Sequence, residues 1–191
     1  MRLLLALALS LPMIGQGYLY SNPTWADRQT GKATLGYCIA QPAPPDAERQ
    51  IEAALKEWAK YVQIDFRRDM CYSDRTLTFS WVAAEHGCGV LGTLSADARS
   101  HAHWPAGASE EPIAGDVHFW VGREWTPTEI YIEALHEIGH ALGLRHGRDP
   151  WGVMYDIASG ALWLQRSDIE AVRRLYARRC HEIECAMRYE R

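Results

Sequence analysis

The sequence predicts a single α+β domain in which a small β-sheet packs against three helices. The first observation is that apolar residues recur three and four positions apart in two segments, as on the buried face of a helix, and that a third segment carries helix start signals. The second is the alternation of apolar and polar residues in shorter segments, which is typical of half-buried strands. The third is the composition: 191 residues, 48% hydrophobic and 23% charged, suit one globular domain with a sizeable core.

The first predicted elements are a strand at residues 34–39 and a helix that begins near Asp46. Residues 42–45 between them are rich in proline, which marks a turn. Asp46 is a suitable N-cap, because its side chain can accept a hydrogen bond from the first helical turn. The apolar face of this helix is predicted to contain Ile51, Ala54, Leu55, Trp58 and Val62.

Alternating apolar residues predict two further strands, one around Ile64 and Phe66 and one around Phe79. Residues 117–121 are predicted to form a fourth strand. Residues 85–112, which lie between the third and fourth strands, are rich in Gly, His and Ala. We expect this stretch to be a loop that contains short pieces of strand.

The second predicted helix has a strong start signal. Thr126 is an N-cap candidate, Pro127 takes the first helical position, and Glu129 completes a capping box. These residues predict a helix over residues 127–142.

The last predicted helix has a similar signature, with Ser167 as the expected N-cap and Glu170 three residues later. Residues 180–191 that follow are predicted to form a charged C-terminal tail. The buried side of the helix is predicted to contain Ile169, Val172, Leu175 and Tyr176.

The second helix carries the motif H-E-x-x-H-x-x-G-x-x-H, which begins at His136. Residues four apart lie on one face of a helix, so His136 and His140 can present imidazole nitrogens to one metal ion, with Glu137 beside it. Gly143 can end the helix in a left-handed conformation and return His146 to the same ion. Three neutral histidines leave the fourth position of zinc open to water, as in catalytic sites. The alternative is an ordinary amphipathic helix whose histidines recur by chance.

The motif predicts a zinc-dependent endopeptidase that hydrolyses internal peptide bonds with one catalytic zinc ion. The zinc would lower the pKa of its bound water toward about 7, and Glu137 would take the proton and deliver it to the leaving amine. The main rival is a catalytically silent secreted zinc module that binds peptide or protein partners. The presence of Glu137 argues against this rival, because a binding module has no use for a general base.

The charge and the N-terminus bound the cellular context. A formal net charge of -4 and the lack of a basic stripe argue against nucleic-acid binding. The apolar run at residues 3–14 predicts a signal peptide over residues 1–17, since a membrane span needs about 20 apolar residues. The alternative is a buried N-terminal strand or helix. We expect export to the extracellular space or periplasm, without a stable membrane anchor after signal cleavage.

The five cysteines fit an oxidising compartment, in which an odd number leaves one thiol unpaired. Their spacing does not assign the pairs. Cys38 and Cys71 lie in or beside two predicted strands that could be neighbours, which favours a bridge between them. The five are Cys38, Cys71, Cys88, Cys180 and Cys185.

The residues after the motif resemble those of the matrixin (matrix metalloproteinase) family, which belongs to the metzincin clan. Pro150 lies four residues and Met154 eight residues past His146. The resemblance implies that Met154 occupies the Met-turn, an apolar floor beneath the metal, a role that suits a thioether. Another metzincin subgroup is the alternative, because Gly147 and Asp156 depart from the commonest matrixin sequence.

The resemblance covers about residues 34–176. It implies a metzincin-type catalytic domain over residues 30–179, with a small twisted, mostly parallel sheet and three helices, the second carrying the zinc motif. It also implies a monomer that acts on polypeptides. No cysteine lies between residues 17 and 34, so we do not expect the family's zinc-blocking propeptide. The other matching segments contain Trp58, Glu85, His86, Gly87, Gly115, Asp116, Val117, His118, Phe119, Trp125, Thr126, Asp168, Ile169, Leu175 and Tyr176.

The resemblance also implies a second, structural zinc site. His86, His101 and His118 match three of its ligands, and Cys88 replaces the family's aspartate. A cysteine outside a disulfide can bind zinc, but an altered ligand can equally mark a lost site, so both interpretations stay open. His103 matches no ligand and is expected to be an exposed loop residue.

Calcium receives little support from the sequence. Trp120 and Arg123 stand where matrixins have an acidic calcium-binding cluster, and calcium needs oxygen ligands. Asp116 alone is weak evidence for such a site.

The segment between Met154 and Asp168 is expected to form the outer wall of the pocket for the residue after the scissile bond, but it does not define substrate preference.

Overall fold

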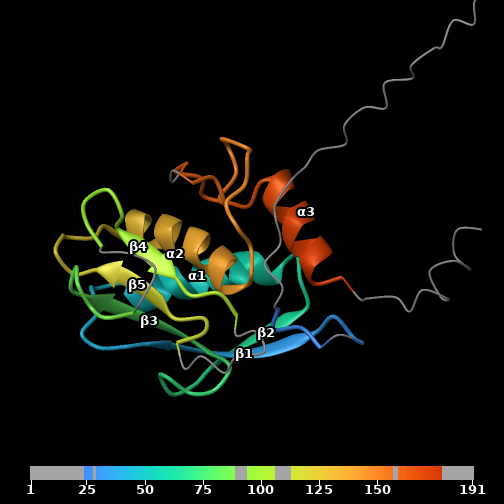
Figure 1. Cartoon of the computed structure of the whole chain (residues 1–191), viewed down its shortest axis with the longest axis horizontal. Coiled ribbons are helices and arrows are strands. Elements are labelled where there is room, and N and C mark those ends of the chain that lie inside the picture. The colour runs from blue at the N-terminus through green and yellow to red at the C-terminus, as the bar shows by residue number, and fades with distance from the viewer. Residues whose placement is uncertain (1–23, 28, 89–93, 106–112, 157–158, 178–191) are drawn as a thin grey trace, which may run out of the picture.

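The computed structural model describes residues 24–27, 29–88, 94–105, 113–156 and 159–177. The expected signal peptide and the C-terminal tail, with Cys180 and Cys185, lie outside the described residues. Within these described residues, three helices and a five-stranded sheet make up the fold (Figure 1).

The sheet has the strand order β2-β1-β3-β5-β4, and only the β4–β5 pair is antiparallel. The predicted α+β class and the mostly parallel sheet are therefore confirmed. The fifth strand, β4, is one of the short strand pieces expected in the long loop. The strands are β1 (Ala33–Ile39), β2 (Ile64–Arg68), β3 (Thr76–Val82), β4 (Ser100–Ala102) and β5 (Val117–Trp120).

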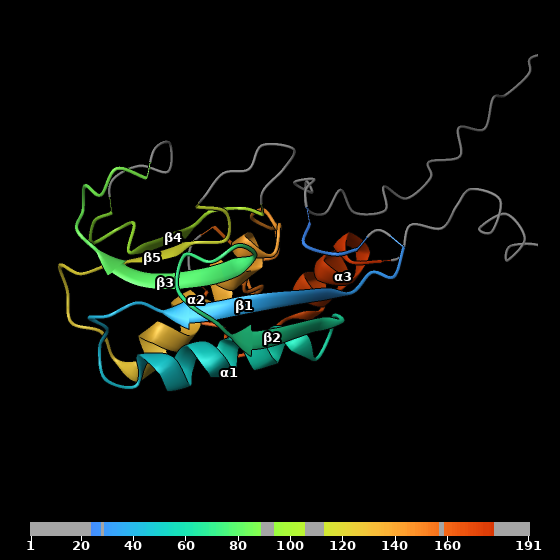
Figure 2. The ribbon, with the colours of Figure 1, turned by 90° about the horizontal axis from the view of Figure 1, so that it is seen from below.

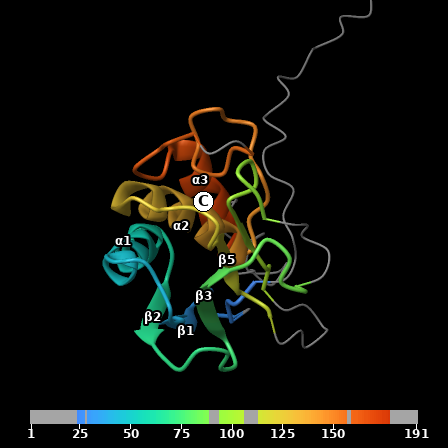
Figure 3. The ribbon, with the colours of Figure 1, turned by 90° about the vertical axis from the view of Figure 1, so that its left-hand side faces the viewer.

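The helices are α1 (Ala47–Ala59), α2 (Pro127–Ala141) and α3 (Arg166–Leu175). Helices α1 and α2 lie side by side on one face of the sheet (Figure 2, Figure 3). Helix α3 stands beyond the C-terminal end of α2 (Figure 1). As predicted, the second helix in the chain carries the zinc motif.

The core lies between the sheet and the helices α1 and α2. Buried indole groups in this core hold α2 in place. Trp58 of α1 is completely buried, and its Nε1 donates a hydrogen bond of 2.9 Å to the carbonyl of Leu135. Trp25, before β1, donates from Nε1 to the carbonyl of Ala141 at 2.7 Å. A buried indole N–H needs such a partner, and each bond here ties a distant segment to the motif helix.

Both ends of α2 form as the sequence predicts. Thr126 is the N-cap, and its hydroxyl accepts from the backbone N–H of Glu129 at 3.3 Å. The carboxylate of Glu129 accepts the N–H of Thr126 at 2.9 Å, which completes the capping box. At the other end Gly143 has φ 105, a conformation that favours glycine, and the chain turns away from the helix axis there.

The first helix begins where predicted, with Asp46 as its N-cap residue, but the expected side-chain capping bond is wrong. Asp46 occupies the N-cap position with φ 65 and makes no side-chain capping bond. In this left-handed conformation its carboxylate instead accepts from the guanidinium of Arg49 at 3.0 Å.

The predicted N-cap of the last helix is also wrong. Helix α3 is capped by Gln165, two residues before Ser167. Asp168 lies at the third helical position, where its carboxylate accepts the N–H of Gln165 at 2.9 Å. The hydroxyl of Ser167 donates to Asp149 at 2.7 Å, so a tertiary contact uses the group that the local pattern assigned to capping.

A disulfide joins Cys38 of β1 to Cys71 after β2, as the sequence favoured. Among the described cysteines, Cys88 is a free thiol. No helix in the described part of the chain is long and apolar enough to cross a membrane.

Candidate active site and metal centre

The three motif histidines converge at the C-terminal end of α2. His136 and His140 lie one helical turn apart, and their Nε2 atoms are 3.1 Å from each other. His146 follows the turn at Gly143 and contributes a third ring nitrogen. One nitrogen from each ring lies within 4.8 Å of the others, so the three could hold one metal ion.

Backbone carbonyls orient the two helical imidazoles. Nδ1 of His136 is 2.6 Å from the carbonyl oxygen of Val153, and Nδ1 of His140 is 2.8 Å from that of Leu144. Because a carbonyl can only accept, each Nδ1 must carry the hydrogen. The lone pair of each ring is then on Nε2, the atom that faces the neighbouring histidine.

Burial keeps these imidazoles neutral. It lowers the pKa of His140 to about 3, and it also lowers the pKa of His136 and of His146. Neutral imidazole is the form that binds a metal ion, so the site is already in its ligating state at neutral pH.

Met154 forms a packed floor under the motif helix. Its side chain is fully buried, and its sulfur would lie 2.2 Å from a Cβ on Gly139, which is too close for any larger residue without a shift. The N–H of Gly147 donates to the carbonyl of Met154 at 2.6 Å, which folds the chain back after the third histidine. The carboxylate of Asp168 accepts the N–H groups of Val153 and Met154 at 2.9 and 3.1 Å.

This role of Asp168 was missed by the sequence reasoning, which placed it only as a match at the start of the last helix. Its side chain is completely buried. A buried carboxylate needs hydrogen bonds, and here backbone N–H groups of the Met-turn supply them. Helix α3 therefore fixes the same turn that orients His136.

Glu137 is buried beside the histidines, with only 4% of its surface exposed. Its Oε1 accepts a hydrogen bond of 2.8 Å from the hydroxyl of Ser100. Its Oε2 has no hydrogen-bond partner among the described residues. Burial raises the pKa of Glu137 to about 8, while the Ser100 bond lowers it and the nearby Glu133 raises it further.

Sequence reasoning also missed Ser100 and Glu133. The hydroxyl of Ser100 lies 2.7 Å from the carboxylate of Glu133, which is buried one helical turn before Glu137. The spacing of the two glutamates on one helix was a signal available in the sequence. The position of Ser100 depends on the sheet and had no local signal.

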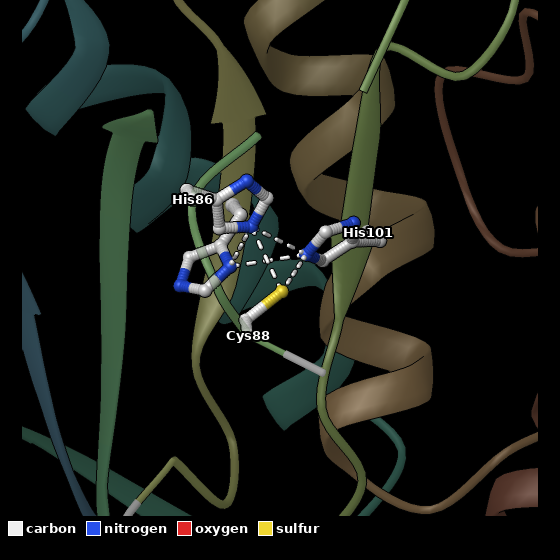
Figure 4. Close-up of side chains that lie close together, drawn as sticks. His86, Cys88 and His101 are labelled. Atoms are coloured by element: carbon white, nitrogen blue, oxygen red, sulfur yellow. Dashed lines mark hydrogen bonds between the residues drawn. The ribbon is translucent and has the colours of Figure 1, made fainter. Parts of the chain in front are cut away.

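A second cluster unites the four residues that the resemblance pointed to. His101 of β4 and His118 of β5 are cross-strand partners, and their ring nitrogens are 3.0 Å apart. From the segment after β3, the sulfur of Cys88 lies 2.8 Å from Nε2 of His86 and 3.2 Å from Nε2 of His101. Figure 4 shows the labelled side chains of His86, Cys88 and His101 pointing toward one another. The four candidate ligand atoms lie within 4.8 Å of each other.

The donor set of this second cluster suits zinc. Burial lowers the pKa of His101 to about 4 and of His118 to about 3, so both rings are in the neutral form that can bind a metal ion. Three imidazoles and one thiol can satisfy all four positions of a tetrahedral ion, as in structural zinc sites. The motif histidines offer one ligand fewer, which leaves a position for water.

The expectation for His103 is wrong, because this residue is buried. Only 8% of its surface is exposed, and its ring packs edge-on against those of His101 and His118, with centroid distances of 5.8 and 5.6 Å. Its backbone continues the pairing of β4 with β5, since its N–H donates to the carbonyl of Asp116 at 2.8 Å. The extended ladder turns the ring inward.

Comparison with known proteins places this arrangement in one family. The sequence profile described as Matrixin matches residues 25–177. Matrix metalloproteinase-20 of Homo sapiens is 30% identical over 175 residues, which cover 83% of this chain and 33% of that protein. Stromelysin-1 of Mus musculus is 30% identical over 169 residues, with 81% and 33% covered. Matrilysin of Homo sapiens is 25% identical over 179 residues, with 88% and 65% covered.

The chain thus spans about a third of the length of the first two relatives. The match includes the motif helix, the Met-turn and all of the described sheet. The chain therefore belongs to the matrixin family of zinc metallopeptidases.

Proposed function

We propose that this chain is a zinc-dependent endopeptidase that hydrolyses internal bonds of polypeptide substrates. The observation that carries the proposal is the convergence of three neutral imidazoles, two of them oriented by backbone carbonyls, beside a buried glutamate. One oxygen of that glutamate has no hydrogen-bond partner among the described residues.

His136, His140 and His146 would hold the catalytic zinc ion. The fit rests on donor chemistry, since the hydrogen bonds at Nδ1 of His136 and His140 direct the Nε2 lone pairs inward. A zinc ion held by three ligands would acidify a water molecule and polarise the scissile carbonyl.

Glu137 would act as general base and then as general acid. In the ionised form of Glu137, which a zinc ion beside it would favour, Oε2 is available to take a proton from the attacking water as the new C–O bond forms. The same oxygen would return the proton to the amide nitrogen as the C–N bond breaks, which releases a neutral amine. The low exposure of the carboxylate strengthens both proton transfers, because few water molecules compete with it.

We also propose that His86, Cys88, His101 and His118 hold a structural zinc ion. Four protein ligands leave no position for a reacting water, so this site would stabilise the fold. It would join the segment after β3 to the strands β4 and β5. The proposal includes no calcium ion, because Trp120 and Arg123 offer no oxygen ligand from their side chains.

The proposed setting is outside the cytoplasm. The disulfide between Cys38 and Cys71 fits an oxidising compartment, and the apolar run at residues 3–14 fits a signal peptide. We propose that the chain acts there as a monomer.

The replacement Glu137→Ala tests the proposal. The full chain is expected to contain two zinc ions and to cleave a casein-type substrate in a chelator-sensitive manner. The E137A variant should keep both zinc ions and lose at least about a thousandfold in rate. A general base typically contributes about a hundredfold to ten-thousandfold. The control is Glu170→Ala, which removes an exposed carboxylate of α3.

Cleavage by E137A at the wild-type rate would contradict the role of Glu137. A wild-type chain that binds zinc and cuts no peptide would favour a zinc-dependent binding module. A wild-type chain with one zinc ion and full activity would remove the structural site from the proposal.

A further inference from the structure

Two buried carboxylates lie one turn apart on the motif helix. Glu133 is 6% exposed and Glu137 is 4% exposed, and their spacing of four residues places them on one face of α2. Like charges at this spacing repel each other, and burial increases the cost when no partner is present. The groups that face this pair therefore decide how Glu137 is held.

Arg99 supplies the balancing charge for Glu133. Its Nη2 forms an ion pair with Oε1 of Glu133, and its Nη1 lies 4.0 Å from Oε1 of Glu129. The side chain of Arg99 is itself only 28% exposed, which limits screening of the pair by water. Among the described residues no comparable cation pairs with Glu137.

Ser100 connects the two glutamates. Its Oγ is 2.7 Å from Oε2 of Glu133 and 2.8 Å from Oε1 of Glu137. Ser100 belongs to β4, where it is the cross-strand partner of the fully buried Phe119. The sheet therefore places this hydroxyl, so its position is better defined than that of a loop side chain.

We propose that Ser100 is a positioning residue for Glu137, held in place by the Arg99–Glu133 pair. This inference rests on the proposed function. The terminal torsion of a glutamate has a broad, two-fold energy profile, so an unanchored carboxylate samples many orientations. The bond from Ser100 fixes Oε1 and leaves Oε2 of Glu137 for the water proton.

Glu133 determines where the Ser100 hydrogen points. A hydroxyl carries one hydrogen and can donate to one acceptor at a time. The carboxylate of Glu133 is already paired at Oε1 with the guanidinium of Arg99, whereas Ser100 is the one hydrogen-bond donor to either oxygen of Glu137 among the described residues. The geometry thus favours donation from Ser100 to Glu137.

Glutamine at position 133 tests this direction. Arg99 is a donor, so the amide oxygen of Gln in E133Q must face it, and the amide NH₂ must then face Ser100. The amide supplies the hydrogen for its contact with Ser100 and leaves the Ser100 hydrogen for Glu137. E133Q should therefore keep kcat within about threefold of wild type, less than the loss typical of a broken supporting contact.

The main experiment compares Ser100→Ala with Ser100→Thr in the full zinc-loaded chain. S100A is expected to lower kcat by about ten- to a hundredfold, the range typical of groups that orient an active-site residue, with KM and zinc content unchanged. S100T keeps the hydroxyl and should restore kcat to within about threefold, again below that range. Ser95→Ala is the control, since the Ser95 hydroxyl accepts hydrogen bonds from the backbone N–H groups of Asp97 and Ala98 in its own loop.

A second comparison separates positioning from general damage. In an E137A background, S100A should leave the residual rate unchanged, because its effect passes through Glu137. Thermal unfolding of each variant shows whether it is folded; if S100A is unfolded, the E133Q and S100T rates carry the test.

The outcomes are distinct from those of the proposed function. If the wild-type chain is inactive, the proposed function fails first. If the wild-type chain is active, the inference is overturned by an S100A kcat within about twofold of wild type, well below the expected range. An equal loss in S100A and E133Q, a loss of zinc in S100A, or a further loss on the E137A background would also overturn it.

Discussion

Gly139 lies on α2 between the two helical histidines and faces the Met-turn. A Cβ at this position would be 2.2 Å from the sulfur of Met154 and 3.0 Å from a ring carbon of Trp58. Since Met154 and Trp58 are both completely buried, neither side chain can move into solvent. The glycine therefore sets how closely the Met-turn approaches the motif helix.

Replacing Gly139 with Ala should destabilise the protein by about 1 to 3 kcal/mol through overpacking. The higher helix propensity of alanine offsets about 1 kcal/mol of this destabilisation. Chemical denaturation of the full chain measures the cost. Because the clash is with Met154, the cost of G139A should be smaller in an M154A background; equal costs in the two backgrounds would contradict this explanation.

Cys88 contributes the one thiol to the second cluster of candidate metal ligands. Its sulfur lies within reach of His86 and His101, and burial raises the pKa of its thiol in the absence of a bound cation. A bound zinc ion reverses this preference, because a coordinating thiol is deprotonated.

Replacing Cys88 with Ala should remove one zinc ion per chain, whereas Cys88→Asp should retain it, because a carboxylate can also ligate zinc. Zinc content by atomic spectroscopy measures both. After cobalt exchange, the wild type should show a thiolate-to-cobalt charge-transfer band that C88D lacks. Two zinc ions in C88A would exclude Cys88 as a ligand.

At the scale of elements, α3 stabilises the active-site turn through one side chain. Asp168 is fully buried and accepts backbone N–H groups from Gln165, Val153 and Met154. Val153 in turn offers its carbonyl to Nδ1 of His136. The helix start, the turn at Met154 and the first candidate metal ligand are thus linked by consecutive hydrogen bonds.

Asp168→Ala should therefore destabilise the fold by about 3 kcal/mol or more, since each bond to a charged acceptor contributes about 1.5 to 3 kcal/mol. It should also weaken zinc binding, because His136 loses its orienting carbonyl. Denaturation and a competition titration with a chelator measure the two effects. Glu170→Gln, an exposed change on the same helix, should stay within about 0.5 kcal/mol; normal zinc affinity in D168A would break the proposed link.

At the scale of the whole molecule, the disulfide and the candidate catalytic site occupy different parts of the sheet. Cys38 is on β1 and Cys71 follows the edge strand β2, whereas Ser100 is on β4 at the opposite edge. The bridge closes a loop with a sequence separation of 33 residues. Its main contribution should be to global stability.

Replacing Cys38 and Cys71 together with Ser should lower the free energy of unfolding by about 2 to 4 kcal/mol. Below the unfolding transition, the double variant should retain wild-type kcat/KM, because the opposite sheet edge does not depend on the bridge. Denaturation and peptide cleavage measure the two quantities. A large loss of kcat/KM in folded protein would mean that the bridge shapes the active site.

Within the described part of the chain, local sequence patterns determined the three helices, four of the five strands and the motif on α2. Period and capping signals report interactions within a few residues of each other, as the Thr126–Glu129 capping box illustrates. The same reasoning failed at Ser167, where a tertiary contact with Asp149 used the hydroxyl. It also failed at His103, which the β4–β5 pairing turns inward.

Only the tertiary structure decided which groups support the site. Ser100 and Glu137 are 37 residues apart in the sequence, and Asp168 is 15 residues from Val153. Such contacts depend on strand register and on the packing of α3, which no local pattern encodes. The sequence by itself thus determined the chemistry of the motif and the family resemblance, while the sheet and the last helix decided how Glu137 and His136 are oriented.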